Sequence, residues 1–211
     1  MSFSRTVATP GQARAALARP DGALDLRAAA DLESAWADVG FRTLVPGELV
    51  RPLDLQLPDL AATRALGARL AAELRPGDLV VLTGPLGAGK TSLTQGLGHA
   101  LGVAGAVTSP TFVLARSHRG PLPLVHVDAY RLRDTGAPAA LDDLDLDLAL
   151  EEGVVVVEWG EGLVEGLTEA RLEVVLSRAE GGGDGADDGR GAQVRAHGAR
   201  WSSGLPDQVT V

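Results

Sequence analysis

Cysteine is absent from this chain of 211 residues, which excludes disulfides, thiolate nucleophiles and cysteine-based zinc sites. Lysine is almost absent, because the 19 basic residues comprise 18 arginines and the single lysine Lys90. A basic excess is missing as well. The 28 acidic residues give a formal charge of −9, so we expect no broad positive field that would attract nucleic acid. Any connection with RNA should therefore depend on a local patch or on partner proteins.

Long apolar runs are also missing. No run approaches the roughly 18 apolar residues that a membrane-spanning helix needs. The N-terminal stretch "MSFSRTVATPGQARAALARP" lacks the apolar core of about 7 to 15 residues that marks a secretory signal. We therefore expect a soluble, cytoplasmic protein without a membrane partner, long enough for one sizeable core and a small appendage.

The chain divides into two unequal parts. Residues 1–52 are predicted to form an extension of unknown role, with a helix at "DLESAWADVG". Within it, "AWADVGFRTL" resembles the closing helix and strand of GNAT-type acetyltransferases, but no Gly-rich pyrophosphate loop precedes it. We interpret the extension as an acetyltransferase remnant or an independent addition to a domain that spans residues 53–211.

The second part alternates between strand and helix patterns. A helix is predicted at "PDLAATRALGARLAAEL", with Asp59 as its N-cap, followed by the apolar strand "LVVLTG" and a helix from about Lys90 to Leu101. Further strands are predicted at "PLVHVD" and at "GVVVVEW", which is apolar enough to be buried on both faces. The acidic "LDDLDLDLAL" is interpreted as loop and short helix. The strands "RLEVVLS" and "AQVRAHGARW" should form a hairpin around the loop "AEGGGDGADDGRG".

A P-loop pattern lies in "LVVLTGPLGAGKTSL": Gly84, four residues, then Gly89, Lys90 and Thr91. It follows a predicted strand and opens a predicted helix, as phosphate binding requires, which makes an accidental match improbable. Glycines let backbone N–H groups turn inward around phosphates, and the helix N-terminus adds partial positive charge. Lys90 can reach β- and γ-phosphate oxygens where a planar guanidinium is too wide. Thr91 can offer its hydroxyl to Mg²⁺.

Three clusters downstream of the P-loop narrow the function. Thr111, in "VTSPTFVLARSHRG", is a candidate for reaching the metal and the γ-phosphate. Asp128, in "LVHVDAYRL", follows a strand as a Walker-B carboxylate does. Glu158, in "VVVVEWGE", ends the most apolar strand and could order the attacking water. Spacing leaves open which of the two acids is the main metal ligand. By the period of two, His126 shares a strand face with Asp128, so it lies either near the site or simply on a less buried strand, and we favour the second interpretation.

The motifs "GPLGAGKTSL", "SPTF", "HVDAYRL" and "VEWGE", in this order, resemble the bacterial tRNA threonylcarbamoyladenosine biosynthesis ATPase family TsaE. The resemblance covers about residues 53–178, with the terminal hairpin included. It implies an ATPase that acts with the TsaB and TsaD proteins and meets tRNA indirectly through that complex. Mg²⁺ is the implied cofactor, and ATP and ADP are the implied substrate and product.

The resemblance also assigns roles to residues and implies a fold. The fold is an α/β P-loop NTPase three-layer sandwich with a mostly parallel sheet and a C-terminal antiparallel hairpin. The catalytic candidates are Glu158, Asp128 and Thr111, and the metal is expected at Thr91 and Asp128. The nucleotide is expected at the following residues of the P-loop and beside it: Gly84, Pro85, Leu86, Gly87, Ala88, Gly89, Lys90, Thr91, Ser92 and Trp159.

Two other function classes share these features. A small-molecule kinase would use the same P-loop but needs an acceptor pocket and an arginine-bearing lid, for which the candidates are Arg116 with Arg119, or Arg131 with Arg133. A nucleotide-dependent interaction module without turnover would use the acidic "LDDLDLDLALEE" as a docking surface. Phosphate transfer to a metabolite would favour the kinase, and absence of turnover even with partners would favour the module.

Overall fold

The computed structural model describes residues 24–25, 42–45, 48–50, 52–135, 139–178, 189–201, 205 and 209. The helix predicted at "DLESAWADVG" and most of the loop predicted at "AEGGGDGADDGRG" lie outside these residues. Within the described ranges, none of the helices combines the length and the apolarity needed to traverse a bilayer.

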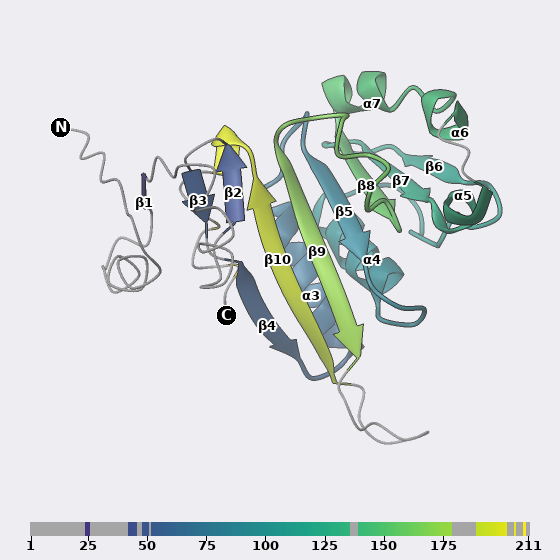
Figure 1. Cartoon of the computed structure of the whole chain (residues 1–211). Helices are drawn as coiled ribbons and strands as arrows, with labels where there is room; N and C mark the ends of the chain where they lie inside the picture. Colours follow the sequence, from purple (N-terminus) through teal and green to yellow (C-terminus); the bar gives the residue numbers. More distant parts are fainter. Residues whose placement is uncertain are drawn as a thin grey trace.

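One seven-stranded sheet forms the centre of the molecule, with the strand order β4-β10-β9-β5-β8-β7-β6 (Figure 1). The strands β9, β5, β8 and β7 are mutually parallel, whereas β4, β10 and β6 add antiparallel pairs at the two edges. The predicted terminal hairpin is β9 with β10, but the edge strands β4 and β6 were not predicted. The bounds are β4 (Leu53–Leu57), β5 (Leu79–Thr83), β6 (Ala115–His118), β7 (Leu124–Asp128), β8 (Val154–Glu158), β9 (Arg171–Arg178) and β10 (Arg190–His197).

Alternating side chains of the central strands build two apolar cores, one on each face of the sheet. In β5, Val80 and Leu82 face the core formed with α3 (Leu60–Ala71) and α4 (Lys90–Ala100), whereas Leu79 and Val81 belong to the other core. That second core lies under α5 (Tyr130–Thr135), α6 (Ala139–Asp142) and α7 (Leu146–Glu152). Every residue of β8 is buried, which confirms that this strand is covered on both faces. The acidic segment is confirmed as short helix and turn.

The two helices α3 and α4 lie side by side behind the sheet (Figure 1). Asp59 caps α3, because its carboxylate accepts a hydrogen bond from the Ala62 N–H at 2.7 Å, as the sequence predicted. Gly89 occupies the N-cap of α4. Glycine has no side chain to accept the first helical N–H groups, and such groups at a helix N-terminus are the donors that bind anions in many proteins.

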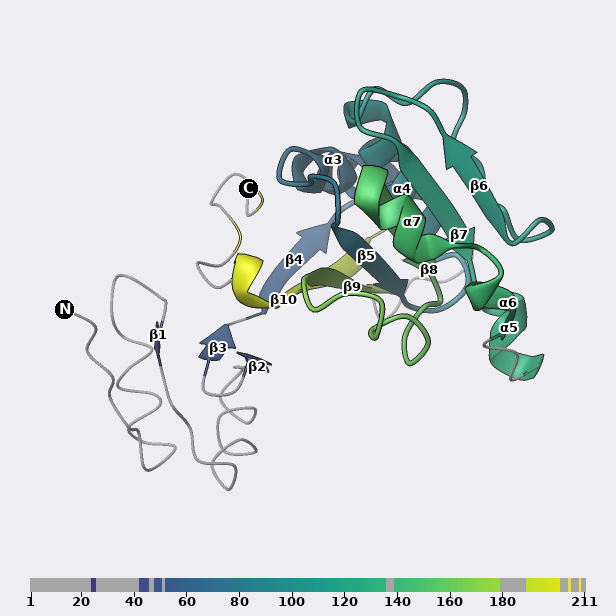
Figure 2. The same cartoon turned by 90° about the horizontal axis from the view of Figure 1, so that it is seen from above.

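The N-terminal strands form a separate antiparallel sheet with the order β1-β3-β2. Their bounds are β1 (Leu24–Asp25), β2 (Arg42–Val45) and β3 (Glu48–Val50). Figures 1 and 2 show this sheet beside β4 and β10, at the edge of the main sheet that is far from β6. The segment "AWADVGFRTL", which resembles part of an acetyltransferase, ends in β2. Its predicted helix lies outside the described residues.

Candidate functional site

The site forms at the carboxyl-terminal ends of three neighbouring parallel strands, β5, β8 and β7. Glu158, the last residue of β8, lies in register with Asp128 at the end of β7 and with Leu82 near the end of β5. The P-loop leaves β5 at this same edge and leads into α4. Carboxyl ends of parallel strands are where α/β proteins bind ligands, so the topology gathers the two predicted acids next to the P-loop.

The P-loop backbone requires glycine at its first position. Gly84 has φ 135°, and a Cβ added there would lie 2.1 Å from the Leu176 carbonyl oxygen of β9. Lys90, only 5 % exposed, donates from Nζ to the Gly84 and Pro85 carbonyl oxygens at 2.7 and 2.9 Å. The same ammonium lies 3.6 Å from the centroid of the Trp159 ring, a cation–π distance.

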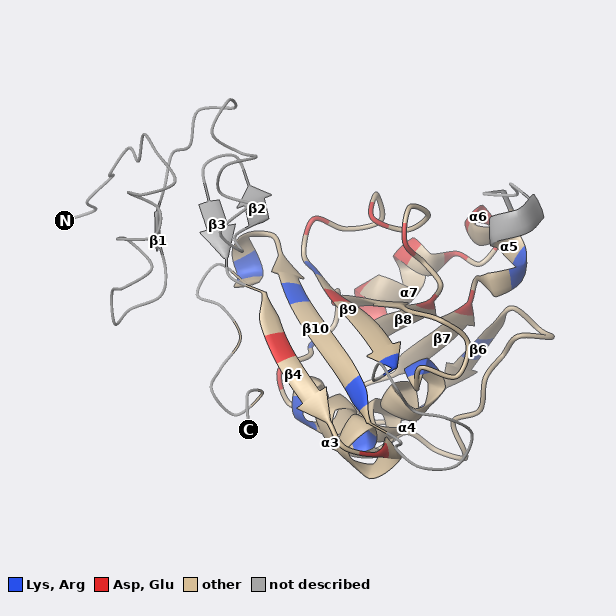
Figure 3. Ribbon diagram, turned by 60° about the horizontal axis from the view of Figure 1, so that its bottom comes forward, with Lys and Arg blue, Asp and Glu red and all other residues tan. Residues whose placement is uncertain are grey.

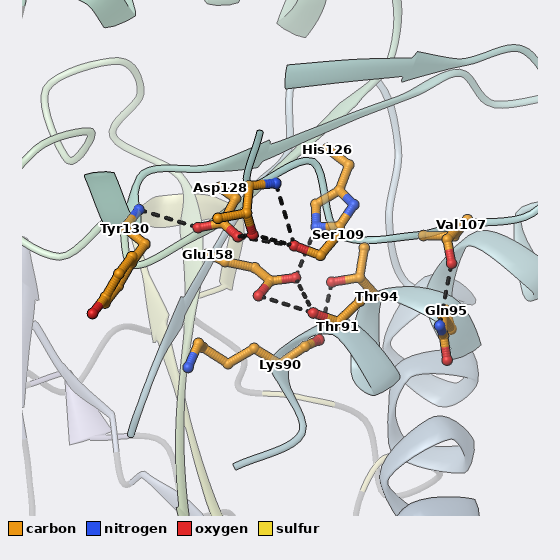
Figure 4. Close-up of polar contacts among 11 residues, drawn as sticks. Lys90, Thr91, Thr94, Gln95, Val107, Ser109, His126, Asp128, Tyr130 and Glu158 are labelled. Atoms are coloured by element: carbon orange, nitrogen blue, oxygen red, sulfur yellow. Dashed lines mark hydrogen bonds and ion pairs between the residues drawn. The ribbon is translucent and has the colours of Figure 1, made fainter. Parts of the chain in front are cut away.

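Glu158 is the acid that contacts the P-loop helix. Its carboxylate accepts the Thr91 hydroxyl at 2.9 Å and lies 2.8 Å from Nε2 of His126 (Figure 4). The interpretation of His126 as a residue of a less buried strand is wrong, because its side chain is fully buried and contacts Glu158. Period-two alternation placed His126 and Asp128 on one strand face, but only the neighbouring strand β8 brings a carboxylate against the ring. His126 therefore holds Glu158 in position for Thr91.

Asp128 contacts a different element, the loop that carries "SPTF". Its carboxylate accepts hydrogen bonds from the hydroxyls of Ser109, at 2.9 Å, and of Thr111. Its other oxygen accepts the Tyr130 N–H at 3.1 Å. The predicted residue Thr111 is thus brought to Asp128. Figure 4 shows Thr91 beside Glu158.

Trp159 adopts a backbone conformation that is rare for a large side chain, with φ 62°. Its N–H donates to the Leu82 carbonyl at 2.8 Å, and its ring lies 5.2 Å from that of Tyr130. This geometry turns the indole from the end of β8 over Lys90. Trp159 therefore lies beside the P-loop lysine.

The oxygen donors at this edge suit Mg²⁺ held together with phosphates and water. Thr91 supplies a hydroxyl, and Glu158 and Asp128 supply carboxylates, the hard ligands that Mg²⁺ prefers. In the part of the chain that the structure describes, no three His, Cys, Asp or Glu side chains converge as a metal cage.

Comparison with known proteins gives the family. The family model "Threonylcarbamoyl adenosine biosynthesis protein TsaE" matches residues 57–184. The tRNA threonylcarbamoyladenosine biosynthesis protein TsaE of Streptomyces coelicolor is 59 % identical over 144 residues, which cover 66 % of this chain and 94 % of the relative. The chain belongs to the TsaE family. Its Bacillus subtilis relative of the same name is 39 % identical over 141 residues, which cover 66 % of this chain and 82 % of the relative.

A solved structure agrees with this membership of the TsaE family. The crystal structure of Bacillus subtilis YdiB is 34 % identical in sequence and superposes with a TM-score of 0.57, covering 71 % of this chain and 88 % of YdiB. The residues matched by the TsaE model include the P-loop, Thr111, Asp128 and Glu158 and leave out residues 1–56.

Two arginines near the P-loop of this TsaE-family chain were missed by sequence reasoning. Arg178 donates from Nη2 to the Leu86 carbonyl oxygen at 2.9 Å, and Arg190 approaches Gly89. They come from the ends of β9 and β10, far along the chain. The arginines considered for a kinase lid all precede β8 in the chain. They were chosen because nearness to the P-loop motifs in the sequence was the only available signal. The hairpin pattern itself, with an arginine at each side of its loop, could have suggested them.

A pocket of about 360 Å³ lies apart from these residues. It has an apolar floor, to which Leu146 and Leu163 contribute, and an acidic rim with Asp142, Asp145 and Glu151. Its acidic residues lie in the α6–α7 segment that the sequence singled out as acidic, and Leu163 comes from the segment that follows β8. None of its lining residues takes part in the contacts around the P-loop.

Proposed function

We propose that this TsaE-family chain binds Mg-ATP, hydrolyses it slowly, and couples that hydrolysis to TsaB and TsaD in the formation of threonylcarbamoyladenosine in tRNA. The observation that carries the proposal is the meeting of the P-loop lysine, the Thr91–Glu158 pair and Asp128 at one sheet edge. Family membership supports the tRNA pathway. Because the chain is acidic overall, we propose that tRNA is met through the complex, in the cytoplasm.

Each residue has a role that follows from its place. The loop N–H groups and Lys90 bind the phosphates. Thr91 and Glu158 are the metal-shell pair in this proposal, since the hydroxyl and the carboxylate already lie 2.9 Å apart. Mg²⁺, when bound, would neutralise charge that develops on the phosphoryl oxygens. Asp128, which is bonded to the hydroxyl of Thr111, would link the SPTF loop to the state of the γ-phosphate.

The internal hydrogen bonds support slow turnover by the isolated chain. Asp128 is engaged by the hydroxyls of Ser109 and Thr111 at one carboxylate oxygen and by the Tyr130 N–H at the other, which leaves its carboxylate little acceptor capacity for a water molecule. A partner that moves the SPTF loop would free it. Phe112 in that loop is 91 % exposed, so a partner can reach this loop directly.

The test is ATP hydrolysis by the full chain, alone and with TsaB and TsaD of the same organism. We expect slow release of inorganic phosphate from the isolated chain and faster release in the complex, with Lys90→Ala inactive in both. Transfer of the phosphate to a metabolite instead would support the kinase. A wild-type chain that Mg-ATP does not stabilise against heat would contradict nucleotide binding altogether.

A further inference from the structure

The segment between Arg133 and Arg171 carries charge of one sign only. It contains eleven of the 28 acidic residues of the chain and no basic residue. Six of these acids fall within the α6–α7 segment: Asp142, Asp143, Asp145, Asp147, Glu151 and Glu152. Figure 3 shows acidic residues around α6 and α7 and along the loop between β8 and β9. A surface of this kind attracts basic partners over some distance.

The pocket of about 360 Å³ lies within this acidic region and exposes apolar surface. Its floor is part of the core under α5, α6 and α7, since three of its lining residues are buried there: Leu141, Leu146 and Val164. Leu163 and Leu167 are only partly buried against that core. Leu148 of α7 also lines the pocket, and it is 59 % exposed. The apolar surface therefore extends from the pocket floor onto the exterior of α7.

The pocket rim consists of four exposed acids: Asp142, Asp145, Asp147 and Glu151. Within the described ranges, no ion pair joins any of these four carboxylates to another residue. Glu165 in the neighbouring loop differs, because its carboxylate accepts the N–H groups of Gly162 and Val164 at 2.6 and 3.1 Å. The rim carboxylates thus face solvent, whereas Glu165 supports the loop.

Charge and shape together select one kind of occupant. The rim repels anions, and no three acidic or histidine side chains converge as a metal cage among the residues that the structure describes. A protein segment that places an apolar side chain on the floor and arginine or lysine at the rim would complement both features. Because Leu148 extends the apolar surface beyond the pocket, such a segment covers more of it than a small amine would.

We propose that this pocket is the docking surface for a basic segment of the partner complex, with one apolar side chain seated between α7 and the loop after β8. The docking surface rests on the proposed coupling to partner proteins and gives that coupling a location. Leu163 and Leu167 belong to the loop that begins directly after Glu158 and Trp159. A partner seated in the pocket therefore contacts the segment that leads out of the site.

The test measures the affinity of the full chain for purified TsaB and TsaD of the same organism, with Mg-ATP present, by biolayer interferometry at low and at physiological salt. The rim variant, Asp145→Asn with Glu151→Gln, should bind roughly twofold to thirtyfold more weakly at low salt. Its affinity should also depend less on salt, since part of the screened attraction is gone. Leu148→Ser should bind roughly tenfold more weakly at both salt concentrations, because it removes apolar contact.

Asp143→Asn with Glu152→Gln is the matched control for the rim variant. Both residues are exposed acids of the same segment, but neither lines the pocket. The control removes the same number of charges and should bind nearly as the wild type does. All three variants should keep the wild-type rise in melting temperature with Mg-ATP, which verifies that they fold and retain the P-loop site.

Equal losses in the rim variant and the control would overturn the docking surface, because the general field of the acidic segment would then account for binding. The proposal requires both the charges and the apolar contact. Wild-type affinity in either the rim variant or Leu148→Ser would therefore overturn it while leaving the proposed function intact. A wild type that hydrolyses ATP but binds neither TsaB nor TsaD would refute the proposed coupling, and the docking surface with it.

Discussion

The Thr91 hydroxyl of α4 donates to the Glu158 carboxylate of β8 at 2.9 Å, across 67 residues of sequence. This bond joins the P-loop helix to the neighbouring strand end. It assigns Glu158, and not Asp128, to the position next to the P-loop hydroxyl. The two acids of the site therefore contact different partners, and their substitutions should have different effects.

Glu158→Gln should weaken the dependence of nucleotide binding on Mg²⁺. The amide keeps the shape of the side chain but not its charge, and metal affinity should fall roughly tenfold to a hundredfold. The measurement is the melting temperature with ATP in the presence of Mg²⁺ or of EDTA. Asp128→Asn should retain most of the Mg²⁺ effect while reducing the difference between Mg-ADP and a non-hydrolysable Mg-ATP analogue. The reverse ranking of the two variants would show that Asp128 is the metal ligand.

Lys90→Ala should lose most of the stabilisation by Mg-ATP, and Lys90→Arg should not restore it. Nζ donates to two loop carbonyls, and the residue Lys90 is only 5 % exposed, so a planar guanidinium does not fit in its place. At a hundredfold excess over Kd, ligand binding adds about 2.7 kcal/mol, which corresponds to a rise of roughly 5 to 10 °C in a chain of this size. Differential scanning calorimetry of the three proteins measures it. An arginine variant that responds fully would show that charge alone suffices.

Trp159 should report nucleotide binding by fluorescence. Lys90 lies 3.6 Å from its ring centroid, and phosphates that attract the ammonium would change the environment of the indole. A protein with Trp36→Phe and Trp201→Phe should change its emission when Mg-ADP is added, and should give a different signal with the Mg-ATP analogue. The complementary variant Trp159→Phe should stay silent. A response confined to that variant would place the conformational change elsewhere.

Acid should destabilise the fold through Glu173 of β9. Burial alone would raise the pKa of this carboxyl, but His197, with help from Arg171, lowers the pKa from 4.5 to about 2. Because the folded-state pKa lies below the unfolded value, the carboxylate stabilises the fold above about pH 4.5, and this contribution is lost as the pH falls towards 2. Urea unfolding between pH 5 and about 2.5 should show a steeper loss of stability for the wild type than for Glu173→Gln. Parallel curves would rule out the contribution.

The sequence by itself determined the parts of this protein that depend on local chemistry. The P-loop between β5 and α4 follows from glycine spacing, the cap of α3 follows from Asp59, and the burial of β8 on both faces follows from its unbroken apolar run. The choice of Asp128 and Glu158 as candidate site residues follows from the rule that ligands bind at the carboxyl ends of strands. Each of these inferences uses residues within a few positions of one another.

Only the tertiary structure decided which of these groups touch. The pairing of Thr91 with Glu158, the burial of His126 against the same carboxylate, and the approach of Arg178 to the P-loop all depend on strand order and register. The edge strand β4 escaped prediction for the same reason, since its partner β10 follows more than a hundred residues later. Hydrogen bonds and charge pairs act over a few ångströms in space, and sequence distance does not determine which strands become neighbours.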